Sequence, residues 1–136
     1  MVGDRVLWRW GDSEQRRHLG AFGAFTFAPD QSVNKLPYFF DTGLVAYGPF
    51  RRRPKDFAGF AVVYGSYSRD LRRAEELQPS LSIGVQQFEM ALEWNYGVVI
   101  KPGLLFQPDV QYLVHPNGTR TIPNAFTIGA NIVVNW

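Results

Sequence analysis

Apolar and polar residues alternate along most of this 136-residue chain. The alternation is most regular at the end, where every even-numbered residue from Phe126 to Trp136 is apolar and the odd-numbered ones are mostly threonine, glycine and asparagine. A period of two places successive side chains on opposite faces of an extended strand. Residues 125–136 are therefore predicted to form a strand with one wholly apolar face.

Other segments show the same period and are also predicted to be strands. The predicted strands lie at residues 5–10, 18–27, 38–47, 58–67, 88–100, 104–114 and 125–136. In the first of them, Val6, Trp8 and Trp10 are expected on one side. Glycine, proline and asparagine mark turns at residues 11–16, 29–34, 48–55, 101–103 and 115–118. The chain is thus expected to be all-β, built from consecutive antiparallel hairpins.

The connection at residues 68–82 is the longest one between predicted strands. It contains the segment Leu71–Leu77, in which the spacing of apolar residues predicts about two turns of helix. No stretch approaches the roughly 20 consecutive apolar residues that a membrane-spanning helix needs. A helical membrane protein is therefore not expected.

Composition supports the all-β prediction and narrows the chemistry. Aromatic residues make up 15% of the chain, which also holds 13 glycines, 9 prolines and no cysteine. Aromatic side chains favour strands, and the lack of cysteine excludes disulfides and thiolate metal sites. The net charge of +2 gives little attraction for nucleic acid, which is not expected as a partner. Because His18 and His115 stand alone in the sequence, no metal site is predicted.

Alternation alone fits two classes of β protein. In a soluble barrel the apolar face points inward, whereas in a porin it meets lipid and the polar face lines a water-filled channel. Predicted strands of about 10 to 13 residues match a tilted membrane crossing better than a soluble sheet. Acidic residues on the polar face would be costly in a dry core. An antiparallel transmembrane β-barrel of porin type is the leading prediction, and a small soluble ligand-binding barrel of lipocalin type is the alternative.

The polar face supplies the candidate functional residues. Those predicted to line the path of a solute are Glu89, Glu93, Asn95, Gln107, Asp109 and Gln111. Glu89 and Glu93 are disfavoured as a glycosidase pair, because four residues along a strand span about 13 Å, beyond the roughly 5 to 9.5 Å that glycoside hydrolysis uses. With no evident nucleophile, base or metal cluster, the chain is not expected to be an enzyme.

Several segments resemble blocks of a known family, in the same order. Residues 107–118 strongly resemble the penultimate-strand motif of the OprB-type carbohydrate-selective porins, and residues 53–59, 93–96 and 124–129 resemble further blocks. The resemblance implies passive diffusion of sugars and other small solutes through a water-filled barrel in the outer membrane of a Gram-negative bacterium, without a cofactor. Since such barrels have about sixteen strands, residues 1–136 are interpreted as the C-terminal segment of a single barrel domain, contributing about its last six or seven strands.

The resemblance also implies partners and an orientation. Sugars would be the transported solutes, outer-membrane lipid would surround the apolar face, and the rest of the barrel would come from a missing N-terminal part. Trp136 would be the terminal aromatic residue that the barrel-assembly machinery reads as an assembly signal. With the C-terminus in the periplasm, the turns at residues 11–16, 48–55 and 101–103 would be periplasmic, and the loops at 29–34, 68–82 and 115–122 extracellular.

Overall fold

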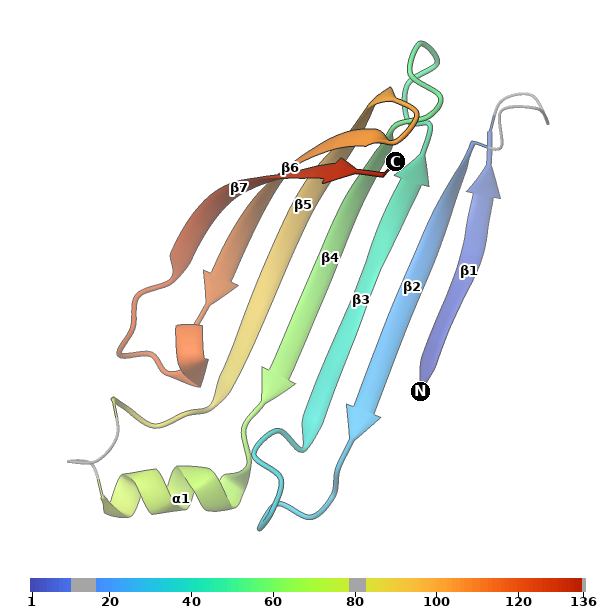
Figure 1. Cartoon of the computed structure of the whole chain (residues 1–136). Coiled ribbons are helices and arrows are strands. Elements are labelled where there is room, and N and C mark those ends of the chain that lie inside the picture. The colour runs from blue at the N-terminus through green and yellow to red at the C-terminus, as the bar shows by residue number, and fades with distance from the viewer. Residues whose placement is uncertain (11–16, 79–82, 136) are drawn as a thin grey trace.

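Seven strands form one curved antiparallel sheet, in which every strand pairs with its neighbours in the sequence (Figure 1). The computed structural model describes residues 1–10, 17–78 and 83–135. The strands are β1 (Val2–Arg9), β2 (His18–Phe27), β3 (Tyr38–Tyr47), β4 (Phe57–Ser66), β5 (Phe88–Lys101), β6 (Leu104–Val114) and β7 (Ala125–Val134). The predicted bounds of β2, β3 and β6 are confirmed at both ends, and those of the other strands differ by one to three residues.

The two ends of the sheet differ in their connections. At one end, which we call the turn end, residues 48–56 join β3 to β4 and residues 102–103 join β5 to β6. At the opposite end, the loop end, lie the connections from β2 to β3, from β4 to β5 and from β6 to β7, with the helix α1 (Arg69–Leu77) and the single turn η3 (Pro116–Gly118), as Figure 1 shows. The short helix predicted from the sequence is confirmed. The turn predicted at residues 11–16 lies outside the described residues, as do residues 79–82.

The connections at the loop end are tied to one another. The backbone amide of Ser68 donates to the carbonyl of Lys35 (2.8 Å), and the amide of Gln87 donates to the carbonyl of Gly118 (2.7 Å). The side chain of Ser68 also caps α1 by accepting a hydrogen bond from the amide of Leu71 (3.1 Å). These bonds hold the three loops of this end as one layer. Within the described part of the chain, no helix is long and apolar enough to cross a membrane.

The two faces of the sheet differ in chemistry. Directly paired residues share a face, so the register places Phe60, Trp94, Val110 and Ile128 in one row on what we call the apolar face. Trp94 is 50% exposed and Ile128 is 72% exposed, and apart from Pro37 in a loop the described residues include no buried apolar side chain. The opposite face, the polar face, carries Glu93. A sheet that leaves its apolar face uncovered needs an apolar surrounding to be stable.

Strand β1 departs from the expected alternation. The register shifts between Val6, which pairs with Gly20, and Trp8, which pairs with Leu19. Because Gly20 and Leu19 are adjacent and lie on opposite faces, so do Val6 and Trp8. The prediction that Val6, Trp8 and Trp10 share one side was therefore wrong: one extra residue in a β-bulge reverses the order of faces, and Trp10 lies beyond the end of the strand.

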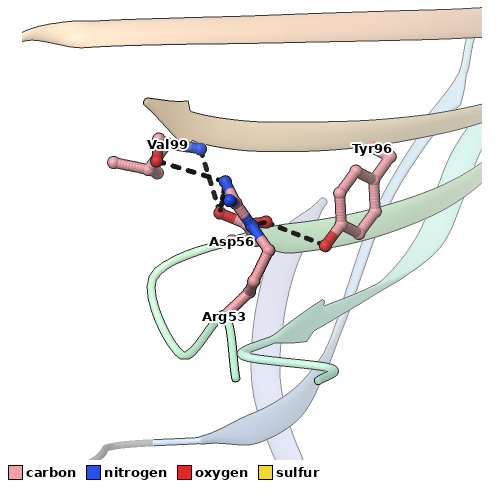
Figure 2. A network of polar contacts seen from close by, with 4 residues as sticks. All are labelled: Arg53, Asp56, Tyr96 and Val99. Atoms are coloured by element: carbon pink, nitrogen blue, oxygen red, sulfur yellow. Dashed lines mark hydrogen bonds and ion pairs between the residues drawn. The ribbon is translucent and has the colours of Figure 1, made fainter. Parts of the chain in front are cut away.

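A buried carboxylate closes the turn that precedes β4. Asp56 is 2% exposed and accepts hydrogen bonds from the Tyr96 hydroxyl (2.9 Å) and the Val99 amide (3.0 Å) (Figure 2). The guanidinium of Arg53 forms an ion pair with Asp56 and also donates to the Val99 carbonyl (3.3 Å). Since Tyr96 and Val99 belong to β5, this network fixes the turn to the neighbouring strand.

We expect Asp56→Ala to destabilise the folded protein. The substitution leaves the Tyr96 hydroxyl and the Val99 amide without their acceptor, and each such loss costs about 1–3 kcal/mol. The unfolding temperature in detergent, read from the loss of the fast-migrating folded band on gels, should fall. The matched control is Lys55→Ala in the same turn, an exposed position where the expected change is within about 0.5 kcal/mol. Equal effects of the two variants would contradict this account.

A comparison of the wild type with Asp56→Ala at different pH values tests whether Asp56 is ionised. Burial by itself raises the pKa of Asp56, but the hydrogen bonds from Arg53, Val99 and Tyr96 outweigh burial, so this pKa lies below its usual value. A carboxylate with a lowered pKa stabilises the fold above its unfolded pKa, and that contribution is lost as pH falls through the folded pKa. The difference in unfolding temperature between wild type and Asp56→Ala should be full at neutral pH and should narrow below about pH 4. A constant difference would argue against an ionised Asp56.

Candidate functional site

Strands β5 and β6 bring four of the predicted solute-path residues together on the polar face. Glu93 pairs with Gln111, and Asn95 pairs with Asp109. The Gln111 amide donates to Glu93 (3.2 Å) and to Asp109 (3.4 Å). The Asn95 amide also donates to Glu93 (3.0 Å). Two side-chain amides thus link two carboxylates into one hydrogen-bonded cluster.

The other predicted residues lie at different heights on the sheet. Glu89 pairs with Gly65, nearer the loop end, and shares the polar face with the cluster. Gln107 pairs with Asn131, nearer the turn end. Trp136, predicted as an assembly signal, lies outside the described residues, so that role stays a prediction. The structure therefore joins four of the predicted polar residues and keeps Glu89 and Gln107 apart from them.

Glycines on the adjacent strands make room for this cluster. Gly129 lies opposite Asp109, and a Cβ atom added to this glycine would stand 2.7 Å from Asp109 Oδ1. Gly59 lies opposite Asn95, and its Cβ atom would stand 2.7 Å from Asn95 Oδ1. Each polar side chain therefore lies across the neighbouring strand instead of standing upright. This arrangement explains why Asp109 is only 9% exposed on an otherwise open sheet.

Aromatic rings occupy the turn-end half of the polar face, and sequence reasoning missed them. Tyr47 and Phe57 pair across β3 and β4, and Phe22 on β2 shares their face. Together with Asn95 and Gln107 they line a depression of about 200 Å³. The apolar residues of alternating strands had been assigned to lipid, so rings on the polar side gave no separate signal. The glycines that face them were the available clue.

The charges on the polar face are predominantly negative. The acidic residues that the register places on this face are Asp4, Asp41, Glu89, Glu93 and Asp109. Such a surface attracts cations and offers acceptors to hydroxyl groups. Among the described residues, no three His, Cys, Asp or Glu side chains are grouped as ligands of a metal ion would be. The arrangement is suited to reversible hydrogen bonds with hydroxyl groups.

The loop end carries a second and larger cavity. It measures about 370 Å³ and lies between α1 and the connection from β6 to β7, with Glu75 and Asn117 in its lining. Gln86 bridges the two sides, because its backbone amide donates to Glu75 (2.7 Å) and its side-chain amide donates to the Asn117 carbonyl (2.7 Å). These bonds explain how α1 is held against the neighbouring loop.

Comparisons with known proteins agree with the geometry. The model of the carbohydrate-selective porin, OprB family, matches residues 2–135. Porin B of Pseudomonas aeruginosa is 26% identical over an alignment of 132 residues, and the match covers 89% of this chain and 29% of that protein. The solved high-pH structure of Pseudomonas putida OprB superposes with a TM-score of 0.89 and 28% identity, covering 98% of this chain and 34% of that one. The chain therefore spans about a third of the length of these relatives, and the predicted porin-type fold is confirmed.

Proposed function

The chain belongs to the carbohydrate-selective porin, OprB family, and from this premise we propose that it forms part of the wall of a passive channel for sugars and other small solutes. The observation that carries the proposal is the contrast between the two faces. The apolar face exposes large side chains such as Trp94, whereas the polar face holds the cluster around Glu93 and Asp109. The apolar face would contact the lipid of the outer membrane of a Gram-negative bacterium, and the polar face would line the water-filled path.

Transport along this wall is diffusion without chemistry. Carboxylate and amide groups replace part of the water around sugar hydroxyls, and contacts that are weak and repeated let a solute leave as easily as it enters. Glu89 and Glu93 do not form a glycosidase pair, because four residues of strand separate them by about 13 Å. The proposed role therefore includes no catalytic step, cofactor or energy source.

The two edge strands define what else the channel needs. β1 and β7 each pair on one side only, so each leaves a row of backbone groups without partners within the described residues. Such groups cost several kcal/mol each in lipid. Because neighbouring strands alternate in direction, β1 and β7 run the same way, and an antiparallel ring closes only with an odd number of further strands. We propose that residues 1–136 are one continuous segment of a single barrel domain whose other strands lie N-terminal to it.

The unequal ends of the sheet support a proposed orientation in the membrane. Porins have short periplasmic turns and longer extracellular loops, so the turn end is assigned to the periplasm and the loop end, with α1, to the cell surface. In this orientation β7 ends in the periplasm, where the barrel-assembly machinery would read Trp136 as its signal.

Deletion of Trp136 should then lower the amount of assembled protein in the outer membrane, and normal assembly of that variant would exclude the signal role.

Solute flux tests the channel itself. Proteoliposomes that contain the protein carrying this chain are expected to swell several times faster in isotonic glucose than protein-free vesicles do. A sample denatured by heating before reconstitution provides the control, because it contains the same protein without the folded channel. Swelling no faster than in the control, for glucose and for other small solutes alike, would overturn the proposed function.

Ion selectivity tests the carboxylates of the wall. We expect Glu93→Gln combined with Asp109→Asn to lower the preference for potassium over chloride by about two- to threefold, because it removes two negative charges with almost no change in shape. The reversal potential across a planar bilayer under a KCl gradient measures this preference. Glu76→Gln on the exposed side of α1 is the matched control and should leave the potential unchanged. Equal potentials for all three proteins would place Glu93 and Asp109 outside the ion path.

Cysteine labelling tests the orientation, since the chain itself contains no cysteine. A maleimide carried on a polymer too large for a porin should label Ser32→Cys, at the loop end, on intact cells. Lys55→Cys, at the turn end, should react only after the outer membrane is permeabilised. The reverse pattern would show that the assigned orientation is wrong.

A further inference from the structure

We propose that the depression on the polar face is a binding site for a single sugar ring, in which aromatic side chains stack on the ring and two amides bind its hydroxyls. The inference rests on the proposed function and adds a specific site to it. The aromatic residues are Phe22, Tyr47 and Phe57, and the amides are Asn95 and Gln107.

Glycines set the position of two of the three rings. A Cβ atom on Gly43 would stand 2.6 Å from the Phe22 ring, and one on Gly97 would overlap the Phe57 ring. Each ring therefore lies over a residue of the neighbouring strand that has no side chain. A ring placed flat on the sheet in this way presents its face to the channel, whereas a ring standing upright would present its edge.

Tyr47 completes the aromatic surface. Its ring stacks on His18 with centroids 4.6 Å apart and lies 6.3 Å from the ring of Phe57. It is 44% exposed, so a large part of it can be contacted from the channel. Stacking on His18 orders this ring without covering it, which lowers the entropy lost when a solute binds.

Polar groups border the aromatic surface on one side. The side-chain amide of Asn95 donates one of its hydrogens to Glu93 (3.0 Å). A primary amide has a second hydrogen and a carbonyl oxygen, which can serve a hydroxyl group at the edge of the depression. Gln107 places a second amide in the same lining. The depression thus combines an apolar floor with hydrogen-bonding groups along its rim.

A pyranose ring has the complementary division of surface. Its C–H groups form an apolar face, and its hydroxyls project around the rim. The volume of about 200 Å³ lies below the roughly 300–1,000 Å³ of sites that enclose drug-sized ligands, and therefore fits one ring at a time. An acyclic polyol of equal size has the hydroxyls but no flat face, so it should gain nothing from the aromatic floor.

The test compares the saturation of glucose flux in variants of Tyr47 and Phe57 that remove or keep an aromatic ring. In proteoliposomes that contain the protein carrying this chain, Tyr47→Leu combined with Phe57→Leu should raise the glucose concentration that half-saturates flux by about tenfold, since it removes two stacking contacts. Tyr47→Leu alone should raise it by about threefold. Tyr47→Phe keeps the ring and should behave as wild type. Flux of an acyclic hexitol should be equal in all of these proteins.

Tyr64→Leu is the control on the opposite face, where Tyr64 stacks on Phe40 with centroids 5.2 Å apart, and it should leave saturation unchanged. The folded band on unheated gels confirms assembly of each variant, and Tyr47→Leu alone changes a side chain that is already exposed. The inference would be overturned if Tyr47→Leu left the half-saturating glucose concentration unchanged, or if the substitutions changed the flux of glucose and of the hexitol equally. Either result would leave the proposed channel function standing. Absence of flux in the wild type would instead overturn the proposed function.

Discussion

Backbone hydrogen bonding in an apolar medium is the constraint on which this structure depends. Lipid offers no water to an unpaired N–H or C=O group, so a strand that crosses a membrane, as proposed for this chain, must find both of its partners in the sheet. That requirement agrees with the strand order from β1 to β7, in which every strand pairs with the next in the sequence. It also explains why the described residues can lack a buried apolar core, because in the proposed location lipid would take the place that a core has in a soluble protein.

The choice of residues on the polar face is less restricted, because the backbone hydrogen bonds already hold the strands together. Glycines can therefore stand on this face at little cost to packing. Opposite Gly59 and Gly129 lie polar side chains, and against Gly43 and Gly97 lie aromatic rings. The glycines thereby give the polar face a shaped surface. The chemistry of this face changes along the sheet, with rings near the turn end and carboxylates nearer its middle.

Most of the sheet is predictable from the sequence, because each strand faces two different surroundings and therefore carries a period of two. The polar residues of β5 and β6 could be assigned to one face for the same reason. The bulge between Val6 and Trp8 was not predictable, since one inserted residue reverses the faces and leaves no mark in composition. The Asp56 network was equally hidden, because its partner Val99 lies 43 positions away in the chain.

Stability and the proposed binding surface meet at the turn end. Asp56 directly precedes Phe57, and its partner Tyr96 directly precedes Gly97. Phe57 and Gly97 are paired across β4 and β5, and the ring of the first lies over the second. The hydrogen bonds of Asp56 therefore fix both members of this pair from the adjacent positions. An exposed sheet face has no surrounding core to hold an aromatic side chain, so the ring that would contact a sugar depends on this buried carboxylate for its place.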